Sequence, residues 1–247
     1  MLSTVLLAIV PAFPGPSLTI PAAGTAPGME TAQETVRESR SKVDFPLRLR
    51  PLGAHEGAAD HRLAGYGLRT KTIFDVHVYA MALYLDPDTT LAALEPFAGK
   101  DGKTLQGEAK VYEEILKPSS AKSLRLVMRR GVSAKDMREA FEDALEPRVE
   151  KAAKEFEMPG GAEALKRFRT LFDQKKLEKG HVIDFTWIPA SGTDAGRLET
   201  RVNGERKTAI PNAALGWALF DVYLGGKPIH KKEKPRLVRR LATLLGA

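Results

Sequence analysis

The stretch from Leu63 to Leu85 is the feature that most constrains the fold, because it is long, mainly apolar and carries Arg69 near its start. Beyond residue 75 its side chains alternate in two sets: Val76, Val78, Ala80, Ala82 and Tyr84, and His77, Tyr79, Met81, Leu83 and Leu85. Both sets are mainly apolar, which predicts a strand with protein on both faces. A charged side chain beside such a strand needs water or an anionic partner. Arg69 is therefore the first candidate for a ligand-binding residue.

Tyr79 is the natural partner of Arg69 if the stretch folds back on itself. On one continuous strand the two residues would lie about 33 Å apart. A reversal at Phe74-Asp75 would instead place them opposite each other across a hairpin. A guanidinium fork beside a phenol hydroxyl suits a carboxylate. A surface arginine and a core tyrosine remain the alternative.

Composition excludes several classes of function. The chain has 247 residues, which is enough for one large domain or two small ones, and its 43% apolar and 28% charged residues are typical of a globular protein. The net charge of +7 accompanies no recognised motif for nucleic acid, so we expect no nucleic-acid partner. Cysteine is absent, the five histidines lack metal-ligand spacing, and there is no glycine-rich phosphate loop. We therefore expect neither a metal nor a cofactor.

The N-terminus resembles an export signal. Residues 2–10 form a short apolar core, no charge precedes Glu30, and small residues around 22–26 offer cleavage sites. The core is too short to span a bilayer, so we expect no stable membrane anchor. The sequence thus predicts a signal peptide over 1–26, a linker over 27–42 and a domain over 43–247, in an exported, periplasmic protein. A disordered N-terminal tail is the alternative.

Strands and helices do not alternate regularly along the domain. Strands are predicted over 43–50, 123–130 and 181–188, and Asn203-Gly204 predicts a tight hairpin between 198–202 and 206–210. Helices are predicted near 91–98, from 134 to 156 with a kink or break at Pro147, and over 162–172, 213–224 and 234–245. This order predicts an α+β antiparallel architecture.

Several ordered pieces resemble the chalcone isomerase-like superfamily. They are Gly65-Tyr-Gly-Leu-Arg69 with Val78–Leu85, preceded by 43–46 and followed by 124–144 and 210–225. The resemblance covers about residues 43–245. It implies an open-faced β-sandwich, a large antiparallel sheet covered on one face by a layer of helices.

The resemblance also suggests how Arg69 is used. In true chalcone isomerases the matching arginine positions a substrate phenolate, helped by a threonine, a tyrosine and an asparagine. Those three positions fall at or near Tyr79, Ala134 and Phe141 here, so most of the polar set is missing. Fatty-acid-binding members instead pair the arginine with a tyrosine, and Arg69 with Tyr79 matches that pair.

The resulting hypothesis is a non-catalytic, exported binding protein of bacterial type for a fatty acid or similar apolar carboxylate. Its expected ligand-binding residues are Arg69, Tyr79, His77, Met81, Leu83, Met137 and Phe141. The alternative is an intramolecular lyase or isomerase that acts on a phenolic or enone substrate. A third possibility is a protein-contact role for a basic C-terminal helix with Lys231, Lys232, Lys234, Arg236, Arg239 and Arg240. The oligomeric state stays open.

Overall fold

A computed structural model describes residues 33–71, 76–172 and 176–246. The predicted signal peptide and the expected reversal at Phe74-Asp75 lie outside these ranges. From Gln33 onward the chain forms one compact unit.

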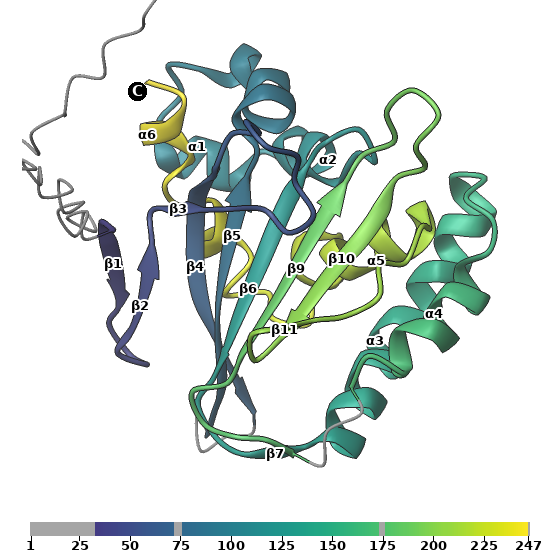
Figure 1. Cartoon of the computed structure of the whole chain (residues 1–247). Coiled ribbons are helices and arrows are strands. Elements are labelled where there is room, and N and C mark those ends of the chain that lie inside the picture. The colour runs from purple at the N-terminus through teal and green to yellow at the C-terminus, as the bar shows by residue number, and fades with distance from the viewer. Residues whose placement is uncertain (1–32, 72–75, 173–175, 247) are drawn as a thin grey trace, which may run out of the picture. The chain divides into compact units, whose positions relative to one another are not determined.

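A seven-stranded sheet forms the centre of this unit, and all of its strand pairs are antiparallel (Figure 1). Its spatial order is β11 (Glu205–Arg206), β10 (Arg197–Val202), β9 (Val182–Ile188), β6 (Lys122–Met128), β5 (Val76–Leu85), β4 (His61–Lys71) and β3 (Arg48–Leu49). The predicted hairpin is confirmed, with Asn203 and Gly204 at φ of 47° and 87° between β10 and β11. Both positive φ values fit the tight turn that Asn-Gly favours.

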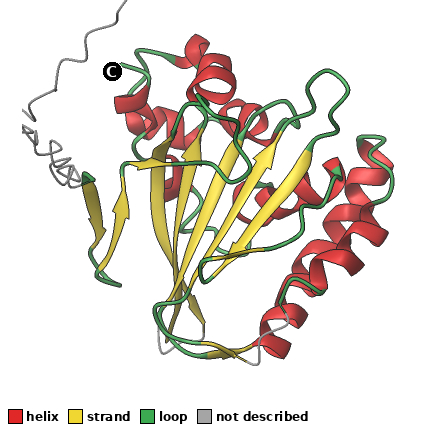
Figure 2. Ribbon diagram, viewed as in Figure 1, coloured by secondary structure: helices red, strands yellow, loops and turns green. Residues whose placement is uncertain are grey.

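Three helices pack on one face of the sheet (Figure 2). They are α3 (Ala134–Glu155), α4 (Gly161–Arg169) and α5 (Ala213–Leu224). Helix α3 begins at the predicted cap, where the Ser133 hydroxyl accepts a hydrogen bond of 3.0 Å from the Asp136 backbone N–H. Pro147 does not divide this helix, which continues for two more turns.

The opposite face is covered near β4 and β5 by a separate two-stranded ribbon, β1 (Thr35–Glu38) with β2 (Val43–Pro46). Phe45 on β2 packs with Ala80, Ala82 and Tyr84 in a second apolar cluster. Strand β5 is therefore covered on both sides, as its two apolar sets predict. The second half of the expected linker is β1 and its turn, because pairing with β2 satisfies its backbone groups.

Two predicted helices are wrong in form. Between 86 and 98 the chain makes a π-helical turn (Pro87–Leu91) and a 3-10 turn (Glu95–Phe97), followed by the unpredicted short helices α1 (Gly102–Gly107) and α2 (Ala109–Leu116). At the C-terminus, a 3-10 turn (Pro235–Val238) and a single turn of α6 (Leu241–Leu244) replace the predicted helix over 234–245. That segment is shaped by its contact with β4 rather than by helical periodicity. The small strands β7 (Val132–Ser133) and β8 (Lys176–Leu177) pair apart from the main sheet.

Candidate functional site

The Gly-x-Gly-x-Arg element lies on β4 where the C-terminal segment packs directly against the strand. A Cβ atom on Gly65 would lie 2.3 Å from the Arg236 carbonyl oxygen, and one on Gly67 would lie 2.6 Å from a Glu233 carboxylate oxygen. The Arg240 N–H also donates a hydrogen bond of 2.8 Å to the Ala64 carbonyl. The two glycines are therefore explained by the close approach of a second backbone, and this contact fixes the strand that carries Arg69.

Arg69 and Tyr79 are directly paired across the β4–β5 hairpin. The guanidinium carbon lies 5.7 Å from the centre of the Tyr79 ring, within the range of a cation–π interaction. The predicted juxtaposition of these two residues is confirmed.

A β-bulge next to this pair changes which side chains face the helices. Arg69 pairs with Tyr79 but Thr70 pairs with His77, so Val78 is the extra residue on β5. A bulge locally changes the direction of side chains on its strand. Val78 consequently lines the cavity described below, whereas His77, which was expected there, is not among its lining residues.

Tyr223, near the end of α5, completes the polar group. Its hydroxyl lies 3.0 Å from the Tyr79 hydroxyl, and both side chains are buried. Within such a pair only one hydroxyl donates to the other, so the second keeps a proton for a ligand acceptor. Sequence analysis missed Tyr223, although a phenol in a mainly apolar helix implies a hydrogen-bond partner.

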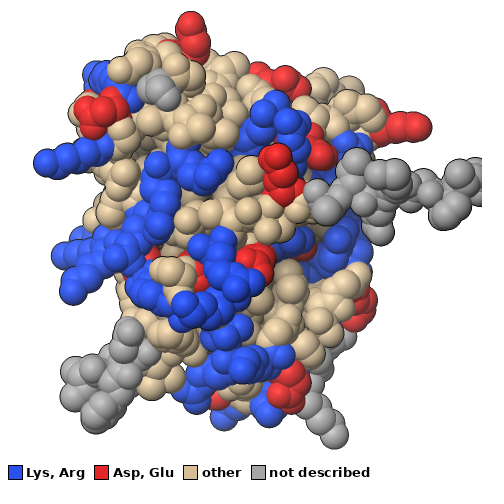
Figure 3. Space-filling view, turned by 90° about the vertical axis from the view of Figure 1, so that its left-hand side faces the viewer, with Lys and Arg blue, Asp and Glu red and all other residues tan. Residues whose placement is uncertain are grey.

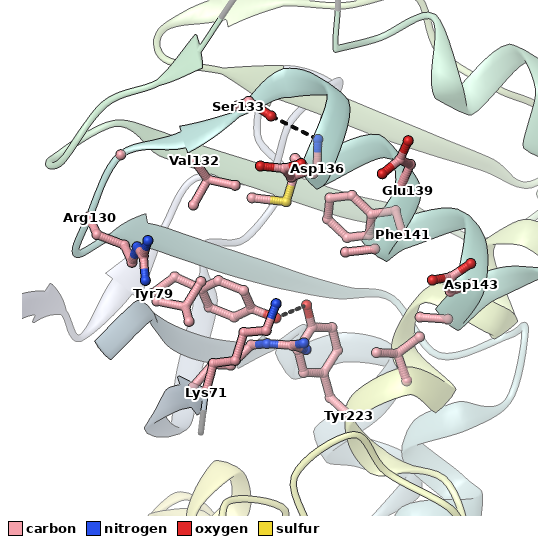
Figure 4. Close-up of a pocket in the computed structure, with 17 residues that line it drawn as sticks. Lys71, Tyr79, Arg130, Val132, Ser133, Asp136, Glu139, Phe141, Asp143 and Tyr223 are labelled. Atoms are coloured by element: carbon pink, nitrogen blue, oxygen red, sulfur yellow. Dashed lines mark hydrogen bonds between the residues drawn. The ribbon is translucent and has the colours of Figure 1, made fainter. Parts of the chain in front are cut away.

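These residues line a cavity of about 380 Å³ between the end of the β4–β5 hairpin, α3 and α5 (Figure 4). Its volume lies in the range of small-molecule sites. The apolar part of its wall comprises Val78, Val132, Met137, Ala140, Phe141, Ala144 and Val222. Met137 and Phe141, four residues apart on one side of α3, are thus placed in the cavity as expected.

Met81 and Leu83 were also expected in the site, but they are not lining residues. Each is only 1% exposed and belongs to the core between sheet and helices, farther along β5 from the hairpin end. They share a strand face with Tyr79, but they are buried in the apolar core that the sheet forms with the helix layer.

Charged side chains surround the mouth of the cavity. Lys71 and Arg130 come from the strand side, and Asp136, Glu139 and Asp143 come from α3. All five are exposed, so the cavity opens to solvent between a basic edge and an acidic edge.

The half-buried Arg69 and the buried Tyr223 have different charge states. Burial acts to lower the pKa of Arg69, but the Tyr79 and Tyr223 phenols outweigh it, and the pKa is raised. Burial raises the pKa of Tyr223 well above its usual value, and its neighbour Tyr79 adds to the shift. Arg69 is therefore a cation and Tyr223 a neutral phenol at ordinary pH. Together they can bind an anionic oxygen through one charged and one neutral donor.

The described residues include no group of three or more histidine, aspartate or glutamate side chains able to hold a metal ion. Over the same ranges, no helix has the length and apolar character needed to cross a membrane.

The described unit is thus an antiparallel sheet backed by helices, with a cation and two phenols at the wall of a largely apolar cavity. The chain belongs to the chalcone isomerase-like family, whose profile matches residues 53–238. The fold class inferred from the sequence is confirmed.

Two relatives are known by their binding properties. The chain is 25% identical over 214 residues to fatty-acid-binding protein 2 of Arabidopsis thaliana, covering 84% of this chain. It spans about half the length of that relative, 51%. The crystal structure of the Arabidopsis thaliana fatty-acid binding protein AtFAP1 superposes with a TM-score of 0.67 at 23% identity, over 87% of this chain and all of that one. This second likeness concerns the fold.

Proposed function

We propose that this protein binds a long-chain fatty acid, or a similar apolar carboxylate, without turning it over. The observation that carries the proposal is the position of Arg69, beside the hydrogen-bonded phenols of Tyr79 and Tyr223 at the wall of a largely apolar cavity. The similarity to fatty-acid-binding protein 2 of Arabidopsis thaliana supports the same ligand class.

In this proposal, each part of the ligand contacts a different part of the site. The carboxylate accepts hydrogen bonds from the Arg69 guanidinium and from the phenol proton that the tyrosine pair leaves free. The acyl chain lies along Met137, Phe141 and Val222. Each methylene moved from water into that wall contributes about 0.8 kcal/mol. The acyl chain then supplies most of the binding free energy, and Arg69 provides the selectivity for a carboxylate.

The test is a titration of delipidated protein with a fluorescent long-chain fatty acid, competed by unlabelled acids. Wild type should bind saturably and discriminate the acid from its methyl ester. Arg69→Ala should weaken binding by roughly 30-fold or more, because losing one partner of a desolvated charge pair costs about 2–5 kcal/mol. Arg69→Lys keeps the charge but not the fork and should fall between the two. Unchanged affinity in Arg69→Ala would refute the assignment.

The retained arginine also supports a second function, intramolecular lyase or isomerase activity. A guanidinium and a phenol can stabilise an oxyanion that develops on an enone substrate. Against it, the tyrosine and asparagine positions of the enzymes fall near Ala134 and Phe141, and neither side chain has a polar group. Spectrophotometric turnover of a chalcone panel that is lost in Arg69→Ala would favour the enzyme over the binding protein.

Export through residues 1–26 is part of the proposal and rests on the apolar N-terminal segment. It predicts a mature protein that lacks this segment and is recovered from the periplasmic fraction. N-terminal sequencing of that fraction tests it, and an intact Met1 in a cytoplasmic product would contradict it.

A further inference from the structure

The positive charge of this protein is concentrated at its C-terminal end. Residues 227–246 contain seven lysines and arginines and one acidic residue, which accounts for six of the seven net charges of the chain. Figure 3 shows the side of the molecule that carries the edge strands and the chain end, where lysine and arginine side chains gather in a band.

Part of this charge has a structural role. Arg236 donates to the buried Glu233 carboxylate at 2.7 Å, and Arg40 contacts the same carboxylate at 3.0 and 2.9 Å. Arg239 stacks over Tyr66 at 4.3 Å. These side chains hold the C-terminal segment against β4, so they are not primarily free to meet a partner.

Lys231 and Lys232 are different, since both are exposed. No ion pair joins either one to a carboxylate within the ranges that the structure describes. Neither lysine therefore neutralises a carboxylate of the described residues. They leave a local excess of positive charge on this surface.

The two lysines line a second cavity, of about 360 Å³, with Arg40, Arg236, His230 and Thr70 among its other residues. This cavity and the Arg69 cavity are lined by neighbouring residues at the end of β4. Arg69 and Lys71 line one cavity, while Thr70, between them in sequence, lines the other. After burial, the positive charge of Arg69 also contributes to lowering the pKa of His230. The basic surface therefore lies directly beside the proposed carboxylate site.

We propose that Lys71, Lys231 and Lys232, here called the basic face, dock on bilayers that contain anionic phospholipids. Docking would bring the mouth of the Arg69 cavity to the membrane surface. The exposed carboxylates of α3 lie at the same mouth, so the lysines rather than α3 make the contact with the anionic lipid. The role of docking in ligand exchange rests on the proposed function, whereas docking itself does not.

Charge complementarity and the proposed ligand both favour a membrane over other anionic partners. Basic residues near an anionic bilayer contribute about 1 kcal/mol each, or about fivefold in binding per residue. A long acyl chain is far more soluble in a bilayer than in water, so its reservoir is a membrane. Phe156 is the single exposed large hydrophobic residue of the described ranges, which offers little base-stacking surface for nucleic acid.

The experiment is sedimentation of the full chain with sucrose-loaded vesicles, made either of phosphatidylcholine alone or with about one third phosphatidylglycerol. The charge-reversed variant is Lys231→Glu with Lys232→Glu. The matched control is Lys154→Glu with Lys166→Glu, two exposed lysines on α3 and α4 that make the same change in net charge. Solution affinity for a fluorescent fatty acid is measured for all three proteins.

Wild type and the control should sediment with the phosphatidylglycerol vesicles, remain free with phosphatidylcholine, and be released by 0.5 M salt, about where the Debye length falls below 5 Å. Reversal of the two lysine charges should weaken binding by at least about 25-fold, since loss of each basic residue alone costs about fivefold, and fatty-acid affinity should be unchanged. Equal binding to both vesicles, no binding by wild type, or an equal loss in the control would overturn docking. If wild type sediments with the anionic vesicles but binds no fatty acid, the proposed function is refuted and docking is not.

Discussion

Substitution of Gly65 by alanine tests why the Gly-x-Gly-x-Arg element has its glycines. The added methyl carbon would lie 2.3, 2.5 and 2.6 Å from the Arg236 oxygen and the Leu237 carbonyl carbon and oxygen. Ordinary contact needs about 3.5 Å or more, so β4 and the C-terminal segment must separate by about 1 Å. All three atoms belong to the backbone and cannot move aside as a side-chain end would. Separation would loosen the packing of Leu237, which is 1% exposed, and the hydrogen bond from Arg240 to Ala64.

The cost should reach the upper end of the overpacking range, about 3 kcal/mol. For a compact unit of this size that lowers Tm by roughly 6–12 °C. The control is Gly107→Ala, since a Cβ there meets nothing within 4 Å and the residue is the last of helix α1. The control should leave Tm equal or slightly higher, because alanine has the better helix propensity. A Gly65→Ala protein that melts within 2 °C of wild type would show that this contact is not what the glycine serves.

Three further predictions concern other buried groups. Glu233→Ala removes a carboxylate that accepts hydrogen bonds from Arg40, Arg236 and the Leu68 N–H. It should lower the free energy of unfolding in urea by about 2–4 kcal/mol. An unchanged midpoint would contradict the role of Glu233 as the link between the β1–β2 turn, β4 and the C-terminal segment. Burial lowers the pKa of His61 to about 4, so the imidazole is protonated in the unfolded chain at a higher pH than in the folded chain. Stability should therefore fall as pH drops from 6.5 towards 4, by at most about 1.4 kcal/mol per pH unit. His61→Gln should reduce that slope relative to wild type in urea titrations at each pH. Tyr223→Phe removes one hydroxyl of the phenol pair and should weaken fatty-acid binding by roughly three- to tenfold with little change in Tm, and an affinity equal to wild type would exclude Tyr223 from the carboxylate site.

Elements whose signals are local could be predicted from the sequence. The Asn203-Gly204 turn, the Ser133 cap and the strand β5 with two apolar faces follow from turn chemistry, capping and period-two alternation. The pairing of Arg69 with Tyr79 was also accessible, because only a reversal can bring residues ten positions apart into one site. These features depend on neighbours within a few residues or on one strand pair.

Tertiary structure decided which side chains the cavity uses. One bulged residue turned Val78 towards α3 and excluded His77, because the side-chain period of a strand shifts wherever the register slips. Met81 and Leu83 lie on the expected face, but the helix layer packs against them. Tyr223 reaches Tyr79 across 144 positions of sequence, a contact that no local pattern encodes.

In the C-terminal segment, too, the sequence revealed one property and the tertiary structure another. Its charges were evident from composition, but its helical periodicity was overridden by close packing on Gly65 and Gly67. Only the folded chain separates the arginines that hold this segment in place from the two lysines that remain exposed. Composition determines how much charge a protein carries, while the partners that packing supplies decide which of those charges remain available to bind.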